Sequence, residues 1–121
     1  MAPPPVPVEV HRHMVFGSHK KKLTKSYMKL NKVCVPLGLG EELRVFGRRS
    51  TWNVVGPSSI ENRVFTFVAT NHQERNPVEY YLCNDWQRFR TAYGLTTRDS
   101  IVFQISNPIS HIMRIRIVRN G

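Results

Sequence analysis

All lysines of this chain lie between Lys20 and Lys32, and no acidic residue interrupts that stretch. Lysine carries a compact point charge that suits phosphate oxygens. Like charges at this density repel one another unless a polyanion neutralises them, so the clustering favours a phosphate-binding surface over a merely solvated face. The candidate phosphate contacts are Lys20, Lys21, Lys22, Lys25, Lys29 and Lys32.

Three short hydrogen-bonding residues, Thr24, Ser26 and Asn31, are interleaved with these lysines. Their hydroxyl and amide groups suit either phosphates or the edges of bases. For Ser26 the alternative is capping of a short helix over Tyr27–Leu30. The run from His19 to Lys25 also matches a short basic nuclear import signal, a pattern that many proteins share by chance.

A second polar segment, Asn71–Pro77, lies between two strand candidates and predicts the tip of a hairpin. Arginine pairs well with guanine in the major groove, and asparagine or glutamine pairs with adenine. An ordinary polar loop is the alternative, but the nearby lysine cluster favours DNA contact. The candidate contacts here are Thr70, Asn71, His72, Gln73, Arg75 and Asn76.

Charge is the outlying property of the composition. The 121 residues (14.1 kDa) carry 18 Lys+Arg against 8 Asp+Glu, which gives a net charge of +10 and a pI of about 10.3. This length indicates one domain, and the charge points to polyanionic partners: nucleic acid, an acidic protein or an anionic membrane. The sequence has no apolar run of about 18 residues, which excludes a transmembrane helix. Residues 1–13 are rich in proline and are expected to form a disordered tail or linker before a domain over residues 14–121.

No pattern for catalysis or for a resident cofactor is visible. The sequence lacks a nucleophile elbow, a phosphate-cradling glycine loop and a paired-carboxylate motif. His11, His13, His19 and Cys34 follow no zinc spacing. We therefore expect no enzyme activity, no cofactor and no metal. Cys34 and Cys83 are predicted to be inert core thiols because apolar strand residues flank each of them.

The elements that must position these candidate contacts are mostly β. Short apolar or alternating runs predict strands over Val33–Val35, Thr51–Val55, Val64–Thr70, Glu79–Cys83, Ile101–Ile105 and Ile112–Val118. Trp86 and Phe89 have helical spacing, which predicts a helix within Asn84–Ala92 that Gly94 ends. Many short strands with one or two short helices indicate a mostly β sandwich or barrel.

Two blocks of the sequence, taken together, resemble one family. Leu23–Pro36 (LTKSYMKLNKVCVP) resembles the opening of the plant-specific B3 DNA-binding domain, and Tyr81–Phe103 (YLCNDWQRFRTAYGLTTRDSIVF) resembles its later block. The later block has the family's residues in register at Trp86, Phe89, Gly94, Leu95, Asp99, Val102 and Phe103. Departures at Tyr27, Arg98 and Pro77 make the resemblance one to a divergent member.

The resemblance implies a mostly β fold, a seven-stranded open pseudobarrel with two short helices, in a plant transcription regulator of the nucleus. It also implies that two arms grip the major groove of double-stranded DNA, one from the first block and one from the hairpin before the second. Three alternatives remain open. They are a nucleic-acid binder without sequence preference, a protein-interaction module that has lost DNA readout, and the DNA-recognition part of a nuclease.

Overall fold

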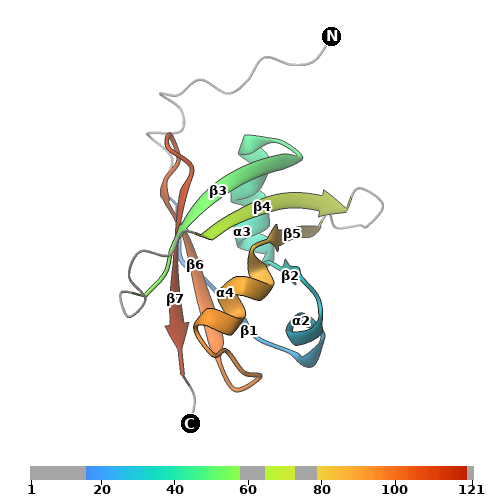
Figure 1. Cartoon of the computed structure of the whole chain (residues 1–121). Helices are drawn as coiled ribbons and strands as arrows, with labels where there is room; N and C mark the ends of the chain where they lie inside the picture. Colours follow the sequence, from blue (N-terminus) through green and yellow to red (C-terminus); the bar gives the residue numbers. More distant parts are fainter. Residues whose placement is uncertain (1–15, 58–64, 73–78, 120–121) are drawn as a thin grey trace.

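The computed structural model describes residues 16–57, 65–72 and 79–119. The strands in this part of the chain form one seven-stranded sheet that curls into an open barrel (Figure 1). The mostly β fold class and the seven-stranded open pseudobarrel predicted from the sequence are therefore confirmed. The tail predicted over residues 1–13 lies outside the described residues.

The order of the strands in the sheet differs from their order in the chain. The strands are β1 (His19–Lys22), β2 (Val33–Cys34), β3 (Arg49–Val55), β4 (Phe65–His72), β5 (Glu79–Asn84), β6 (Ser100–Asn107) and β7 (Ile112–Val118). Their order in the sheet is β1-β6-β7-β3-β4-β5-β2, and all pairs are antiparallel except the parallel pair of β3 and β7. Because β1 and β2 are the two edges, the segment that joins them runs from one edge of the sheet to the other.

Alternation along the strands fills the barrel with aromatic side chains. On β3, Trp52 is fully buried while its neighbour Thr51 is exposed. On β4, Phe65 and Phe67 are both buried and pack against Phe89, with ring centroids 5.1 and 5.6 Å apart. Phe65 and Phe67 share one face of the strand predicted over Val64–Thr70, because residues two apart on a strand point to the same side.

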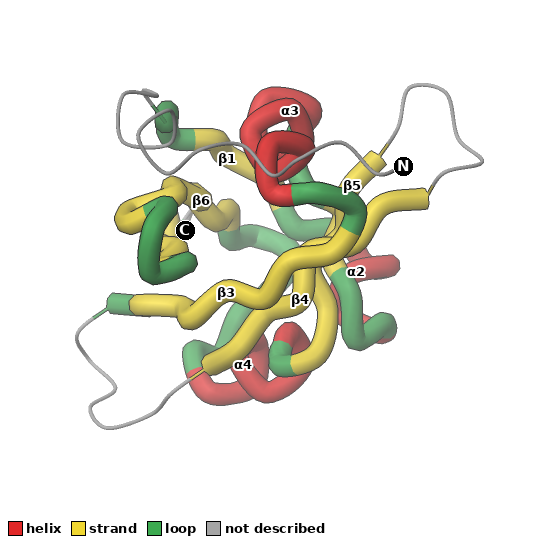
Figure 2. The backbone as a smooth tube through the Cα atoms, turned by 90° about the horizontal axis from the view of Figure 1, so that it is seen from above, coloured by secondary structure: helices red, strands yellow, loops and turns green. Residues whose placement is uncertain are grey.

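Three α-helices and one 3-10 helix occur in the described residues, where the resemblance implied two short helices. They are α2 (Lys25–Lys29), α3 (Leu37–Leu43), η1 (Arg44–Phe46) and α4 (Trp86–Ala92). The helix α3 was not predicted from the sequence, because its residues LGLGEEL include two glycines. It forms because Leu39 and Leu43 are fully buried against the sheet, and packing overrides the poor helix propensity of glycine. Figure 2 shows α3 and α4 on opposite sides of β3 and β4.

The helix predicted within Asn84–Ala92 begins later, because Asn84 still belongs to β5 and turns the chain with a φ of 72°. Asp85 precedes α4 but does not cap it; its carboxylate accepts the backbone N–H of Thr66 at 2.8 Å. Gly94 follows the helix with a φ of 58°, a left-handed conformation that glycine adopts without a steric cost. The predicted end of the helix is therefore confirmed.

Three further details differ from the sequence predictions. The capping alternative for Ser26 is wrong, because Ser26 lies inside α2 and Thr24 occupies the boundary position. Asn71 continues β4 as the cross-strand partner of Tyr80, so it belongs to the strand and not to the hairpin tip. Cys34 and Cys83 are both half-buried on the sheet and not in the core, so the prediction that they are core thiols is wrong.

Candidate nucleic-acid interface

The first arm, residues Leu23–Lys32, connects the two edge strands of the sheet and carries α2. Within α2 the side chains of Tyr27 and Met28 pack against the core, while Lys25, Ser26 and Lys29 are exposed. The helix therefore fixes the direction of its lysines by burying its other side. Its two exposed lysines extend into solvent from a backbone that the core holds in place.

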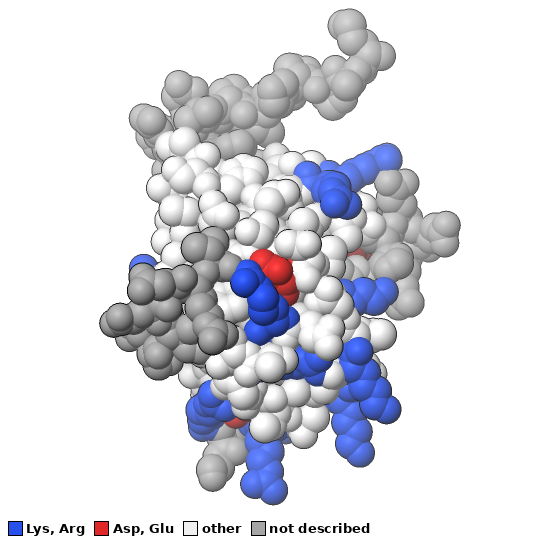
Figure 3. All heavy atoms as spheres, viewed as in Figure 1, with Lys and Arg blue, Asp and Glu red and all other residues white. Residues whose placement is uncertain are grey.

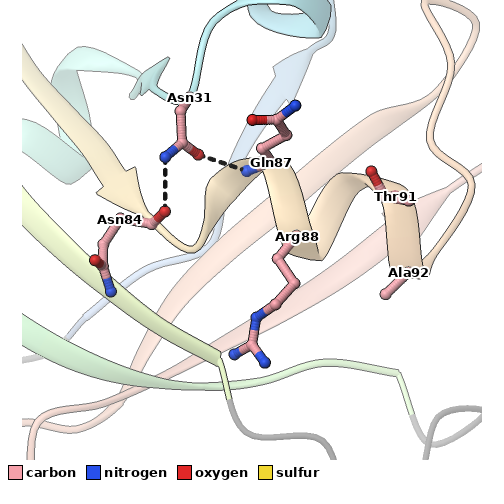
Figure 4. Close-up of a pocket in the computed structure, with 6 residues that line it drawn as sticks. All are labelled: Asn31, Asn84, Gln87, Arg88, Thr91 and Ala92. Atoms are coloured by element: carbon pink, nitrogen blue, oxygen red, sulfur yellow. Dashed lines mark hydrogen bonds between the residues drawn. The ribbon is translucent and has the colours of Figure 1, made fainter.

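Two contacts with α4 and the end of β5 anchor the first arm. The indole N–H of Trp86, a fully buried residue, donates to the backbone carbonyl of Tyr27 at 2.9 Å. The side-chain amide of Asn31 donates to the carbonyl of Asn84 at 2.8 Å and accepts the backbone N–H of Gln87 at 2.7 Å (Figure 4). Asn31, a candidate DNA contact in the sequence, thus uses both functional groups to hold the arm.

The same contacts surround a shallow hollow beside the arm. It has a volume of about 600 Å³ and is lined by Asn31, Asn84, Gln87, Arg88, Thr91 and Ala92 (Figure 4). Arg88 is held there by Asp85 at 2.9 Å and stacks over the ring of Phe65, so its charge is partly compensated. The hollow is therefore part of the junction between the first arm and α4.

The second arm is the end of β4 and the start of β5, with residues 73–78 between them outside the described part of the chain. Thr70 is half-buried and lies opposite Tyr81 across the β4–β5 pair. His72, at the last described position of β4, is the cross-strand backbone partner of Glu79. The candidates Gln73, Arg75 and Asn76 lie outside the described residues, so their predicted DNA contacts stay predictions.

Asn71 lies on the other face of β4 from Thr70, beside the buried Tyr80. Burial raises the pKa of the Tyr80 hydroxyl above its usual value of 10.0, and a hydrogen bond with the Asn71 side chain opposes that rise. The same hydroxyl donates to the carbonyl of Gly47 at 3.0 Å. Asn71 therefore has a partner within the fold, and Tyr80 ties the second arm to the turn before β3.

The pairing of β2 with β5 brings the two arms side by side. Val33 pairs with Leu82 and Cys34 with Tyr81, so Lys32, the last residue of the first arm, lies next to the second arm. Its Nζ lies 5.1 Å from the centroid of the Tyr81 ring, within the range of a cation–π interaction. The structure thus joins two segments that are about forty residues apart in the sequence.

Arg49 lies beside the two arms, and it was not predicted from the sequence as a DNA contact. Arg49 pairs with Thr70, and Thr70 pairs with Tyr81, so the three residues share one face of the sheet. Arg49 is exposed at the start of β3. The alternation of β3 around Trp52 was the signal that could have placed Arg49 on this outer face.

In Figure 3, one group of Lys and Arg side chains lies on the side of the molecule that carries α2 and the ends of β2 and β4 in Figure 1, and others lie along its lower end. We use the name arm surface for the exposed cations Lys25, Lys29 and Arg49 together with the half-buried Lys32 and Thr70. Among the described residues of β3, β4 and β5, Glu79 is the only carboxylate, and it accepts the Tyr81 hydroxyl at 3.0 Å.

The three lysines of β1 do not all lie on the arm surface. Lys21 lies over the ring of Tyr27 at 5.2 Å from its centroid, next to the first arm. Lys20 and Lys22 are exposed on the opposite face of β1. Lys20 pairs with Val102, and Val102 pairs with Arg116, so Lys20 belongs to the outer face of β1, β6 and β7. One cluster of lysines in the sequence therefore divides over two faces.

Among the residues that the structure describes, no group of three or more His, Cys, Asp or Glu side chains is placed to hold a metal ion. His19 instead pairs with Glu42 at 2.9 Å, which fixes the start of β1 to α3. The described helices are all too short or too polar to cross a membrane.

Two solved structures from Arabidopsis share this arrangement of strands and helices. The first is a FUS3–DNA complex, which aligns with a TM-score of 0.63 and 18% identity over 84% of this chain and 96% of that one. The chain has a B3-like fold. The second is a hypothetical Arabidopsis thaliana protein, with a TM-score of 0.65 and 15% identity over 88% of this chain and 94% of that one. No family model and no curated protein sequence matches the chain.

The B3-like fold confirms the resemblance found in the two sequence blocks at the level of the fold. Both alignments cover nearly the whole of the neighbour's chain, so the correspondence extends over the domain and not over one motif. At 18% and 15% identity these similarities establish the fold alone. The chemistry of the two arms depends on the side chains that this chain carries there.

Proposed function

We propose that this B3-like chain is a sequence-specific double-stranded DNA-binding domain of a plant transcription regulator that acts in the nucleus. The observation that carries the proposal is the arm surface, on which the two arms meet through the contact of Lys32 with Tyr81. The FUS3 structure, which has the same fold, is a complex with DNA. The function is binding, and we assign no catalytic step to the chain.

The mechanism has two stages. Lys25, Lys29, Lys32 and Arg49 dock on phosphates, an attraction that positions the domain without reading sequence. Thr70 and the residues of the hairpin tip then reach the base edges of the major groove, where arginine suits guanine and asparagine or glutamine suits adenine. The anchors at Trp86 and Asn31 hold the first arm before DNA arrives, which reduces the ordering cost of binding.

The test is selection of bound duplexes from a random pool at about 150 mM salt, which suppresses non-specific attraction. An enriched motif is expected, and alanine at Gln73 or Arg75 should then relax single positions of that motif. Retention without enrichment would support a binder without sequence preference. Failure to retain any duplex would contradict DNA binding and favour a protein-interaction module.

A further inference from the structure

A second cationic surface lies on the outer face of β1, β6 and β7. We call it the outer cationic face, and it consists of Lys20, Lys22, Arg114 and Arg116. All four residues are exposed, and the register places Lys20 and Arg116 on either side of Val102. The intervening positions of the same strands, such as Phe103 and Ile115, are buried in the core, so the four charges point away from it.

No carboxylate compensates these four charges within the described part of the chain. The residues between them on β6 are Ser100, Val102 and Gln104, which are uncharged. Asp99, which precedes β6, is a buried residue, and its carboxylate is bound by Arg119 at 3.1 Å. Like charges held together on a rigid sheet repel, and an anionic partner relieves that repulsion.

Protection of a sheet edge does not account for this surface. Lysines on an edge strand prevent pairing with other chains, which would explain Lys20 and Lys22 on β1. Arg114 and Arg116 lie on β7, which pairs with β6 over its whole length but with β3 only from Ile112 to Arg114. Arg114 therefore lies where the strand is paired on both sides and needs no such protection, so the protection of an edge does not explain its charge.

The spacing of the charges fits an extended peptide. Alternate residues of one strand lie about 6.8 Å apart, and β1 and β7 lie about 10 Å apart across β6. The cations therefore form two parallel rows, and an extended peptide presents every second side chain at the same interval. The face exposes no aromatic side chain on which unpaired bases could stack. Arginine also binds carboxylates through two parallel hydrogen bonds.

From these observations we propose that the outer cationic face binds an extended acidic segment of a partner protein. The partner's carboxylates alternate with other residues and lie along the rows formed by Lys20 with Lys22 and by Arg114 with Arg116. Because this surface is on other strands than the arm surface, the domain binds the acidic segment and DNA at the same time.

The experiment measures fluorescence anisotropy of a labelled peptide of alternating Glu and Ser with the whole chain. The double variant R114Q/R116Q should bind this peptide about tenfold more weakly. The matched control K25Q/K29Q removes the same charge from the arm surface and should stay within about twofold of the unchanged chain. A peptide of equal composition with all Glu in one block should bind the unchanged chain more weakly.

Circular dichroism and thermal melting establish that both variants are folded, which their exposed positions favour. Equal weakening by the two variants would mean that net charge alone attracts the peptide, and would overturn the proposal. So would displacement of the peptide by duplex DNA together with a loss of DNA affinity in R114Q/R116Q, because the outer cationic face would then belong to the DNA interface. Absence of peptide binding at low salt would also overturn it.

Discussion

Asn31 lies in the first arm, and its side chain stabilises the fold by hydrogen bonds to a distant segment. Its amide makes hydrogen bonds to the backbone at both Asn84 and Gln87, in a segment of the chain more than fifty residues away. A side chain with both groups engaged holds the first arm at a fixed distance from α4. Asn31 therefore positions the arm, and its predicted contact with DNA stays a prediction.

Replacement of Asn31 by alanine should lower the free energy of unfolding by about 1–2 kcal/mol, because two hydrogen bonds are lost. Urea denaturation measures the change. Ser26→Ala is the control, since Ser26 is exposed on the same arm and caps no helix. Equal stability of the two variants would contradict the anchoring role of Asn31.

Tyr80 makes the stability of the fold depend on alkaline pH. Burial raises the pKa of its hydroxyl, so the folded chain keeps a proton that the unfolded chain loses above pH 10.0. The stability that this group contributes is therefore complete below pH 10.0 and is lost as the pH rises toward the pKa of the folded state. The ionised hydroxyl also loses its donation to Gly47.

We expect the free energy of unfolding of the unchanged chain to fall above pH 10.0 more steeply than that of Tyr80→Phe. Urea titrations at several pH values measure both curves. Other groups titrate in the same range, and the difference between the two curves removes their contribution. Parallel curves would contradict a raised pKa at Tyr80.

At the scale of elements, α3 holds the start of the edge strand β1 in place. Glu42 of α3 accepts hydrogen bonds from the ring of His19 at 2.9 Å and from the backbone N–H of Gly17 at 3.1 Å. Gly38, one turn earlier, lies directly against the His19 ring, because a Cβ added there would lie 2.8 Å from the ring. The glycine at position 38 thus makes room for the contact that fixes β1.

Gly38→Ala should destabilise the chain by about 1–2 kcal/mol relative to Gly40→Ala, although both changes improve helix propensity by a similar amount. Gly40 lies in the same helix, and a Cβ there would be 3.6 Å from Tyr80, an ordinary contact. Thermal unfolding of the two variants measures the difference. Two variants of equal stability would show that the His19 ring moves aside without cost.

Six of the seven described strands were predictable from sequence because the alternation of buried and exposed residues is local. The strand β1 was not predicted, because its sequence HKKK has no apolar residue. Phe65 and Phe67 on β4, and Met113 and Ile115 on β7, are buried as their spacing predicted. The helix α3 was not predictable in this way, because it depends on contacts with residues elsewhere in the chain, such as that of Gly38 with the ring of His19.

The candidate site was predictable in part. The sequence located the first arm through its lysines, but the distribution of those lysines over two faces depends on the pairing of β1 with β6. The role of Arg49 depends on its pairing with Thr70, and that of Asn31 on contacts with α4. The type of each residue shows which contacts its side chain can make. Only the register of the strands shows which of these side chains lie on the same surface.

For the whole molecule, the division of charge determines how binding responds to salt. If the arm surface contacts DNA through Lys25, Lys29, Lys32 and Arg49, four phosphates are neutralised. The logarithm of the association constant should then fall against the logarithm of the salt concentration with a slope of about −3.6. The outer cationic face adds to the net charge of +10 but releases no counterions from this duplex.

The double variant K25Q/K29Q should therefore reduce the slope to about −1.8, since two phosphate contacts are lost, whereas R114Q/R116Q should leave it unchanged. Titrations of a labelled duplex between about 50 and 200 mM salt measure the slopes. Both variants carry the same net charge, so long-range attraction alone would change the two slopes equally. A difference between them can arise only if the phosphates lie against the arm surface, and equal slopes would locate the DNA elsewhere on the molecule.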